Sequence, residues 1–358
     1  MTSFANNHTF DFGYGGLISS LEALNEAGLV PTGVGMNLDE AAAPVYLETT
    51  TGRVALISMT SSFVNDAAIA GRQSRRFIGR PGLNPLRVVE WIELPREHFA
   101  VFQEVAECSG VNAAVAISRS EGYTALKTNN NEVEFGRQPL KFFAGNELKY
   151  HTFCNKEDLD RLQRAIYEAQ AQADCILVSI HAHQVGGTAK ESVPEFLVEF
   201  AHKCIDMGAH AVIGHGPHLM RPIELYKGKP IFYSLGDFIL HNESFESSPE
   251  DFYAKHGLTS DDPLCDVYRK RSRNYTCGLL TDNRMLEAVI PYFEIVDGQL
   301  THLELLPIAL GIGEPRYRLG TPAFCPDRGI IERLAGMSEP YGTEIAVRED
   351  GIGIVALS

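Results

Sequence analysis

Three short stretches of the sequence combine histidine with asparagine, glycine or a second histidine. They are Asn6-Asn7-His8, His181-Ala182-His183, and the pair His215 and His218. Imidazole nitrogens and amide oxygens suit borderline divalent metals such as zinc, manganese and iron. The glycines on either side of His215 let the backbone bend sharply enough to turn both rings toward one point. A single histidine near a strand end is usually structural, but three such loops together predict a site for a divalent ion.

A divalent ion held by these loops would support hydrolysis. One or two such cations can activate a water molecule at neutral pH and neutralise the oxygens of a phosphoryl group. A positioned histidine can then protonate the leaving oxygen, which is worth about 10²–10⁴-fold in rate. Further histidines are expected to be structural or to lie on the surface: His151, His202, His210, His241, His256 and His302.

The central histidines follow two apolar segments, residues 175–180 and 211–213, which are typical of buried strands. A helix with one apolar face is predicted before each strand. The first covers residues 159–169, and the second begins near Pro194 and ends before Gly208. This order of strands and helices predicts an α/β core whose functional loops lie at the strand ends.

The remainder of the chain contains weaker patterns. The sequence predicts a helix over residues 17–27 and hairpins over residues 45–57, 222–235 and 292–306. Residues 60–150 are rich in arginine, glycine and asparagine with weak periodicity, which is typical of irregular connections around one or two helices and strands. Residues 243–275 are polar and charged, and we expect them to form an insertion or a mobile lid over the site.

The composition is that of an ordinary globular protein of 358 residues, with 44% hydrophobic and 22% charged residues. The 46 acidic and 31 basic residues give a net charge of −15. This charge disfavours nucleic acid and anionic lipid as partners, unless one face concentrates the basic residues. No apolar run reaches the ~18 residues that span a bilayer. Seven scattered cysteines are typical of reduced thiols, so we expect a cytoplasmic protein without a membrane segment.

The histidine-bearing stretches resemble the motifs of one family. Residues 3–13, Ser-Phe-Ala-Asn-Asn-His-Thr-Phe-Asp-Phe-Gly, are similar to the Asn-Asn-His-x-x-Asp-x-Gly motif of the CapA family, named for poly-γ-glutamate capsule synthesis. Residues 208–218 resemble the family's Gly-Ala-Asp-x-Val-x-Gly-His-x-Pro-His element, and residues 222–238 match the signature that follows it. The resemblance covers most of the chain. It implies a calcineurin-like metallophosphatase fold of the α/β class, a β-sandwich flanked by helices in four αββα layers, with a dinuclear metal site at the strand ends.

The resemblance also implies a role for each candidate site residue. Asn7 would be a metal ligand, and His8 would be the acid beside the metals. His181 and His215 would bind the same ion as Asn7, and His218 would face a second ion. The further candidates are His183, Asp237 and Asp11. The implied cofactor is a divalent metal ion, one or two of manganese, zinc or iron.

The sequence departs from the family pattern in three places. Relatives normally begin with a strand that carries Gly-Asp, and the superfamily places Asp-x-His upstream of Asn-His, but Asn7 is only the seventh residue here. Asp237 replaces the usual asparagine of Leu-Gly-Asn-Phe, and Gln184 stands at an acidic position of the His181 loop. The first strand or strands would therefore be missing, by truncation or in a genuine short variant. A single ion with three ligands is then an alternative to a two-metal site.

Three functions follow as alternatives for a single domain of residues 1–358 with its insertion at 243–275. The first is a metal-dependent hydrolase of metallophosphatase type that acts on a phosphoester or in poly-γ-glutamate and capsule synthesis. The second is a non-catalytic accessory protein that binds an acidic polymer, which the missing aspartates favour. The third is a metal-dependent peptide epimerase. The expected partner is a small-molecule substrate or an acidic polymer, not nucleic acid.

Overall fold

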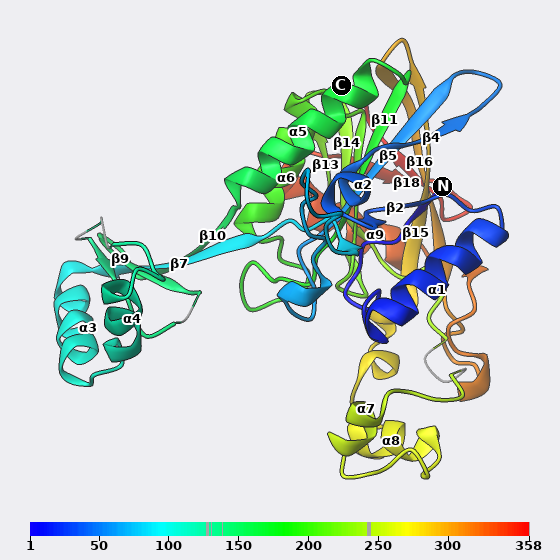
Figure 1. The fold of residues 1–358 in the computed structure, drawn as a ribbon. Coiled ribbons are helices and arrows are strands. Elements are labelled where there is room, and N and C mark those ends of the chain that lie inside the picture. The colour runs from blue at the N-terminus through cyan, green and yellow to red at the C-terminus, as the bar shows by residue number, and fades with distance from the viewer. Residues whose placement is uncertain (127–128, 130, 138, 242–244, 358) are drawn as a thin grey trace. The chain divides into compact units, whose positions relative to one another are not determined.

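The computed structural model describes residues 1–126, 129, 131–137, 139–241 and 245–357. Contacts between residues divide the chain into two compact units (Figure 1). The first unit contains residues 1–86 and 157–358, and the second unit contains residues 87–156. The second unit falls in the stretch where the sequence pattern is weak, and the single domain stays a prediction.

A six-stranded sheet carries the candidate site of the first unit. Its strands in spatial order are β13 (Met220–Tyr226), β14 (Lys229–Leu235), β12 (Ala211–His215), β11 (Cys175–His181), β5 (Arg53–Thr60) and β4 (Val45–Glu48). The four inner strands run parallel, and the two edge strands pair antiparallel with their neighbours. His181 lies opposite His215 on one side and Thr60 on the other, so three strands end at one edge. Both predicted strands and the hairpins over 45–57 and 222–235 are confirmed.

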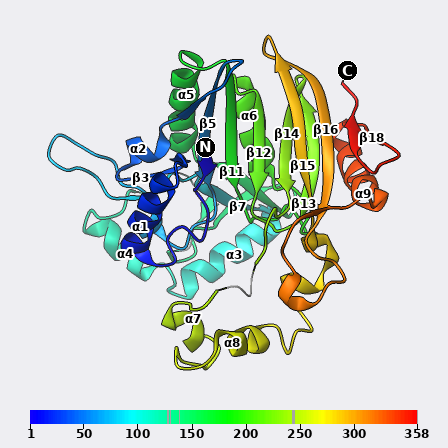
Figure 2. The ribbon, with the colours of Figure 1, turned by 90° about the vertical axis from the view of Figure 1, so that its right-hand side faces the viewer.

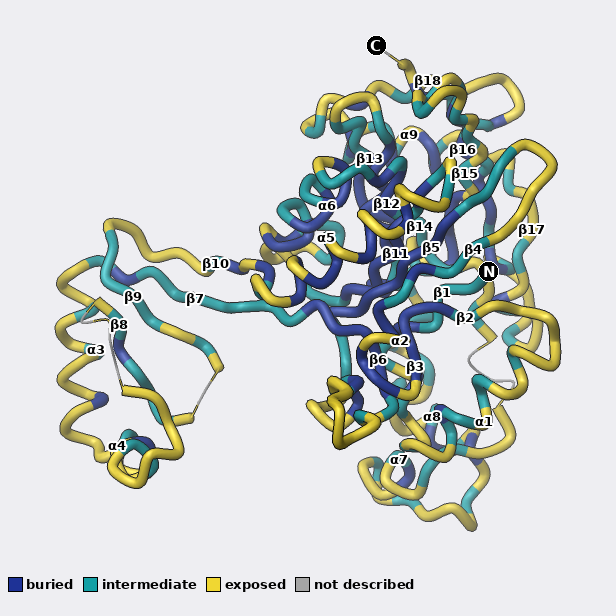
Figure 3. The backbone as a smooth tube through the Cα atoms, turned by 45° about the horizontal axis from the view of Figure 1, so that its top comes forward, coloured by how far each residue is buried: buried dark blue, intermediate teal, exposed yellow. Residues whose placement is uncertain are grey.

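The inner strands are apolar because both faces of the sheet are covered. Ile176, Val178 and Ile180 of β11 are almost completely buried, as expected for a parallel strand inside an α/β unit. Figure 3 shows the buried backbone gathered along β11, β12 and β14. Helices α5 (Lys156–Gln170) and α6 (Glu195–Asp206) lie before and after β11 in the chain, and each buries one apolar face. They confirm the two predicted helices, with Pro194 as the cap residue that precedes α6.

A second sheet packs with helix α9 (Arg328–Ser338) against this one. Its strands are β15 (Glu287–Val296), β16 (Gln299–Ala309), β17 (Ala323–Phe324), β18 (Ile345–Val347) and β19 (Gly353–Val355). Phe232 of the six-stranded sheet, Leu305 of β16 and Leu334 of α9 belong to one buried cluster. Figure 2 shows β15 and β16 beside β13 and β14, with α9 next to β18. The prediction of a mixed α/β protein is thus confirmed, with several sheets.

Short elements complete the N-terminal part of the first unit. They are β1 (Thr2–Ser3), α1 (Gly13–Glu26), β2 (Pro31–Thr32), β3 (Val34–Gly35), α2 (Leu38–Ala42) and β6 (Gly82–Leu83). Strand β1 pairs parallel with β2, and β3 pairs antiparallel with β6. The loop between β1 and α1 carries Asn7 and His8. The predicted helix over residues 17–27 corresponds to α1, which begins four residues earlier at Gly13.

The segment predicted as an insertion or lid contains two helices, α7 (Glu250–Ala254) and α8 (Leu264–Arg271). Residues 243 and 244 lie outside the described residues. Tyr253, Leu264 and Val267 are buried together in a small core of the segment's own. This core accounts for its local order, and its movement as a lid stays a prediction.

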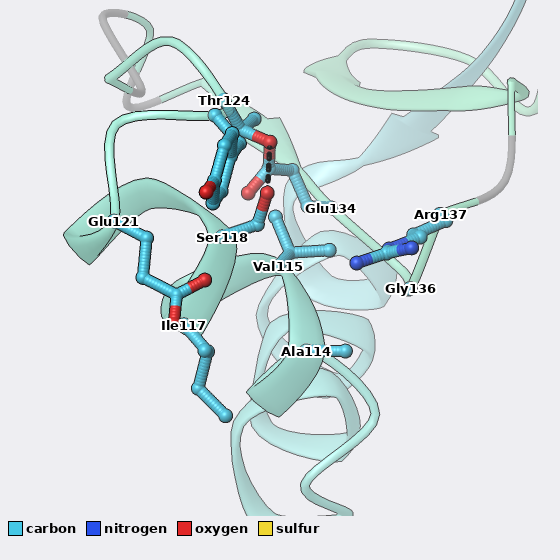
Figure 4. A pocket seen from close by; sticks show the side chains of 10 residues that line it. Ala114, Val115, Ile117, Ser118, Glu121, Thr124, Glu134, Gly136 and Arg137 are labelled. Carbon is cyan, nitrogen blue, oxygen red and sulfur yellow. Dashed lines mark hydrogen bonds between the residues drawn. The ribbon is translucent and has the colours of Figure 1, made fainter.

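The second unit is a four-stranded sheet with two helices among its described residues. Its elements are β7 (Val88–Pro95), α3 (Arg96–Cys108), α4 (Ala113–Ser120), β8 (Glu132–Val133), β9 (Lys141–Gly145) and β10 (Lys149–Cys154), with the strand order β10-β7-β9-β8. The ring of Phe102 on α3 packs 4.3 Å from that of Phe142 on β9, between centroids. A hollow of about 740 Å³ adjoins α4, lined among others by Val115, Ser118 and Arg137 (Figure 4).

The described residues include no helix that is both long enough and apolar enough to cross a membrane. All seven cysteines are free thiols in the structure. The remaining described helical segments are single 3₁₀ turns: Asp66–Ala68, Leu279–Thr281, Asn283–Leu286, Arg316–Arg318 and Glu339–Tyr341.

Candidate metal centre

The ends of β11 and β12 bring His181 and His215 into direct contact. The two residues are register partners, and their Nδ1 atoms lie 2.8 Å apart. Gly214 allows this arrangement, because a Cβ there would lie 2.4 Å from the carbonyl oxygen of Tyr233 on β14. Gly216 has φ +125°, a conformation that side-chain-bearing residues rarely adopt, and it turns the chain away from β12. A larger residue at position 214 or 216 would therefore disturb the backbone beside His215. This agrees with the glycine-bounded loop that the sequence predicted.

Asn7 and His183 reach the opposite side of the His181 ring. His181 Nε2 lies 2.9 Å from Asn7 Oδ1 and 3.0 Å from His183 Nε2. The backbone N–H of His183 donates to Ser62 Oγ at 3.0 Å, which fixes the turn after β11. The structure thus brings residues of all three predicted loops to one point.

His218 joins the same group through His183 and is held by Asp237. The ring centroids of His183 and His218 lie 5.3 Å apart, and the two rings meet edge to face. His218 has φ +61°, a left-handed conformation that is rare for a residue with a side chain. Its Nδ1 lies 3.0 Å from Asp237 Oδ2, so its other ring nitrogen is left for the site. We call His181, His183, His215 and His218 the histidine cluster.

Burial makes three rings of the histidine cluster electrically neutral. Burial, together with the neighbouring His215 and His183, lowers the pKa of His181 to about 2. Burial, and then His218, lowers the pKa of His183 to about 4. Burial also lowers the pKa of His215 to about 4, against the opposing effect of Asp237. These three rings are uncharged at neutral pH, which is the form of imidazole that binds metal ions.

His8 lies next to Asn7 in the chain but contacts a different partner. Its Nδ1 lies 2.7 Å from Asp11 Oδ2, and both side chains are exposed. The hydrogen bond to Asp11 raises the pKa of His8, while burial and the charge of Arg271 at the end of α8 oppose the rise. Asp11 makes no hydrogen bond to the histidine cluster among the described residues. The effect of Arg271 indicates that the insertion borders the loop of His8.

Gln184, at the position where the family carries an acid, has a structural role. Its Nε2 donates to the carbonyl oxygen of Ser61 at 2.9 Å, and Ser61 Oγ donates to its Oε1 at 2.8 Å. The neighbourhood is therefore poor in carboxylates, with Asp237 held against His218. Neutral imidazoles and the amide oxygen of Asn7 are donors that fit a borderline divalent ion, so the residues present are suited to one.

A buried arginine beside His183 was missed by the sequence analysis. Arg221 of β13 is fully buried, and its Nη2 donates to the carbonyl oxygens of Gln184 at 2.7 Å and Lys190 at 3.0 Å. Its Nη1 has no hydrogen-bond partner. Burial lowers the pKa of Arg221 to about 10, which leaves it charged at neutral pH. The signal in the sequence is an arginine inside an apolar strand, since arginine is almost never fully buried without a partner.

A second group of ligand-type side chains lies in the second unit. Glu93 of β7, Glu147 of the β9–β10 turn and His151 of β10 place one ligand atom each within 4.8 Å of one another. Glu93 Oε2 lies 3.2 Å from His151 Nε2, and Glu93 Oε1 accepts the backbone N–H of Asn146 at 2.7 Å. These bonds lower the pKa of Glu93. The sequence analysis missed this group because Glu93 precedes Glu147 and His151 by more than fifty residues in the chain, and His151 was expected to be structural or to lie on the surface.

Comparison with known proteins connects the first site to a described family. The family model for bacterial capsule synthesis proteins, PGA_cap, matches residues 1–242, a range that contains every residue of the histidine cluster. The uncharacterized protein y4sH of Sinorhizobium fredii is 30% identical over 362 residues, which cover 99% of this chain and 75% of that protein.

Two further relatives are longer than this chain. The probable polyglutamine synthesis accessory protein Rv0574c of Mycobacterium tuberculosis is 27% identical over 98% of this chain and 65% of its own length. The capsule biosynthesis protein CapA of Bacillus anthracis is 23% identical over 66% of this chain and 39% of its own length.

Proposed function

Because the chain belongs to the family of bacterial capsule synthesis proteins, PGA_cap, we propose that it is a metal-dependent hydrolase of metallophosphatase type. Its substrate would be a phosphoester or an intermediate of poly-γ-glutamate and capsule synthesis. The observation that carries the proposal is the convergence of Asn7, His181, His183 and His215 through contacts of 2.8–3.0 Å at one sheet edge. The two packed sheets with α5 and α6 support the four-layer αββα arrangement of that superfamily.

In this proposal Asn7, His181 and His215 hold one divalent ion of manganese, zinc or iron. His218 faces a second ion if one is bound, and His183 is a further candidate ligand. A bound ion would supply an activated water molecule and a positive charge for the phosphoryl oxygens.

The surrounding residues would perform the remaining steps. The hydrogen bond to Asp11 raises the pKa of His8, which favours the protonated ring that would donate a proton to the leaving oxygen. Asp237 orients His218 through its Nδ1. The charge of Arg221 beside the neutral cluster would draw an anionic substrate toward it.

The accessory function is the second candidate, and the scarcity of carboxylates favours it. Asp237 contacts His218, and a glutamine stands at position 184, so few negative charges are available to hold two divalent ions. The name of the mycobacterial relative also describes an accessory protein. In this case the neutral cluster and Arg221 would bind an acidic polymer without cleaving it. A peptide epimerase stays a prediction from the sequence.

The test is turnover by the metal-loaded protein. Purified chain dialysed against Mn²⁺ should hydrolyse an aryl phosphate, and His215→Ala should reduce the rate by about 10²-fold or more. The matched control is His241→Ala, since His241 contacts Thr321 outside the cluster. Metal binding without turnover on phosphate or glutamyl substrates would favour the accessory function. Deuterium uptake from solvent into a peptide without cleavage would favour the epimerase.

A further inference from the structure

Three serines from three strands form a row of hydrogen bonds that ends on the candidate ligand His215. Ser58 Oγ of β5 lies 2.6 Å from Ser3 Oγ of β1, and Ser179 Oγ of β11 donates to Ser3 Oγ at 3.0 Å. His215 Nε2 lies 2.8 Å from Ser179 Oγ. Ser58 and Ser179 are almost fully buried, where a hydroxyl is costly unless it is paired. We call Ser58, Ser3 and Ser179 the serine row.

The direction of these bonds determines which nitrogen of His215 carries a proton. A serine hydroxyl has one hydrogen, and that of Ser179 is used in the bond to Ser3. Only lone pairs of Ser179 Oγ are left for His215, so the ring must donate its Nε2–H. We propose that Ser179 is a positioning residue that holds His215 in the tautomer with Nε2 protonated and Nδ1 bare. Its importance for metal binding rests on the function proposed above, whereas the tautomer itself does not.

The bare Nδ1 of His215 has consequences for the neighbouring groups. Because it lies 2.8 Å from His181 Nδ1, His181 must donate there, and its own Nε2 is then bare. That Nε2 lies 2.9 Å from Asn7 Oδ1, so two lone-pair donors face each other. A divalent cation held by both would satisfy such a pair, as would an N–H donated by His183 Nε2, which lies 3.0 Å from His181 Nε2. The serine row thus acts on the metal centre through His181: it leaves His181 Nε2 bare toward Asn7, while His215 Nδ1 accepts the N–H of His181 in the metal-free protein.

The surroundings of the serine row leave room for its hydroxyls. Gly33 has φ +86°, and a Cβ there would lie 2.8 Å from Ser58 Oγ and 2.6 Å from the Cβ of Ala5. An alanine at position 58 or 179 would fit the buried strand and would need no hydrogen-bond partner. The hydroxyls of Ser58 and Ser179 are therefore explained by their bonds within the serine row and to His215, rather than by packing.

The test reads the tautomer directly in metal-free protein. In protein labelled with ¹⁵N-histidine, two-bond proton–nitrogen correlations distinguish a protonated Nε2 from a protonated Nδ1. The signals of His215 are assigned by their loss in His215→Gln. We expect a protonated Nε2 in the unmodified chain. A protonated Nδ1 would overturn the proposal, whether or not the protein binds metal, so this result is independent of the proposed hydrolase activity.

Variants extend the test to metal binding. Ser179→Ala should give His215 a mixture of tautomers and lower the affinity for Co²⁺, followed by its visible absorption, by about 10–100-fold. Ser179→Thr keeps the hydroxyl and should restore both. The matched control is Ser338→Ala, a fully buried serine of α9 that donates to the carbonyl oxygen of Leu334 and not to the histidine cluster. An unchanged tautomer in Ser179→Ala would also overturn the proposal, and Ser58→Ala gives a second, more distant perturbation of the same row.

Discussion

The two groups of ligand-type side chains in this protein differ in how their charges are balanced. In the first unit, His181, His183 and His215 are neutral because burial lowers the pKa of their rings. In the second unit, Glu93 is a carboxylate that already accepts a backbone N–H and lies beside His151. Proximity of ligand atoms is common to both groups. The difference is that only the first presents several neutral imidazoles, whose closest contacts are with one another and with Asn7.

This comparison indicates that burial and proton pattern, rather than spacing alone, distinguish a metal centre from an ion pair. Metal ions compete with protons for the lone pairs of the ring nitrogens. A ring with a lowered pKa holds a proton weakly, so less free energy is spent on releasing that proton when a metal ion binds. Glu93 accepts the peptide N–H of Asn146, and a carboxylate oxygen must give up such a bond before it can bind an ion. The histidine cluster is accordingly expected to bind more tightly than the group of Glu93, Glu147 and His151.

The largest expected effect is the loss of metal on removal of His181. His181→Ala removes the ring that contacts Asn7, His183 and His215, and we expect Mn²⁺ affinity to fall by about 10²-fold or more. Isothermal titration of the metal-free protein measures this loss. The matched change in the other group is His151→Ala. If both variants lost metal equally, the distinction between the two groups would be wrong.

The second prediction separates the units by the pH at which each loses stability. The pKa of His183 and of His215 is lowered from 6.5 to about 4, so the unfolded chain binds more protons between these values. Stability of the metal-free first unit should therefore fall as pH drops from 6.5 toward 4, by on the order of 1–3 kcal/mol. Glu93 has a lowered pKa instead, so its contribution is present above 4.5 and is lost only as pH falls below that value.

The chain offers a selective probe for this second prediction. Its single tryptophan, Trp91, lies on β7, so tryptophan fluorescence reports the second unit. Hydrogen exchange of peptides from β11 and β12 reports the first. We expect the protection of β11 and β12 against exchange, corrected for the intrinsic pH dependence of the amide exchange rate, to fall between pH 6.5 and 4.5 while the midpoint of Trp91 fluorescence in denaturant is constant. If the exchange of β11 and β12 and the midpoint of Trp91 fluorescence changed together over this pH range, the assignment of the pH effect to the first unit would be wrong.

The parts of the fold that the sequence predicted are those with strong local patterns. The apolar runs before His181 and His215 identify parallel strands, because buried strands need no polar alternation. The two histidine-bearing strand ends and Asn7 were predicted to converge, and the contacts of His181 with Asn7 and His215 join them. The assignment of these residues as metal ligands stays a prediction.

The parts that the sequence did not predict depend on pairing across long separations. Strand β7 carries Glu90 and Glu93 among apolar residues without strict alternation, and it pairs with β10, which lies over fifty residues later. Ser3, Ser58 and Ser179 show no spacing that would connect them, and only the sheet order brings them together. The contact between His8 and Asp11 is local, but the spacing alone did not indicate that they pair with each other rather than with a metal.

The third prediction concerns Asp237, which the resemblance places near the metal loops. Asp237 contacts His218 Nδ1, so it acts on a ring of the cluster rather than on a turn among the described contacts. Asp237→Asn keeps an acceptor but removes the charge, and we expect Mn²⁺ affinity to fall about tenfold. Asp237→Ala removes both and should lower it further. Equal affinity in all three proteins would show that the charge and the bond to His218 are irrelevant to the metal.

The smallest expected effect is in the second unit, where Glu93→Gln tests the other side of the comparison. The amide keeps the acceptor for the backbone N–H of Asn146 but removes the charge beside His151. If Glu93 serves the β9–β10 turn, metal affinity should change by less than about twofold, within the range of an exposed polar change. The midpoint of Trp91 fluorescence should shift slightly, because Trp91 lies opposite His151 in the register of β7 and β10. A large loss of metal with no shift of that midpoint would instead identify Glu93, Glu147 and His151 as a binding site, and would show that neutral buried donors are not required in this protein.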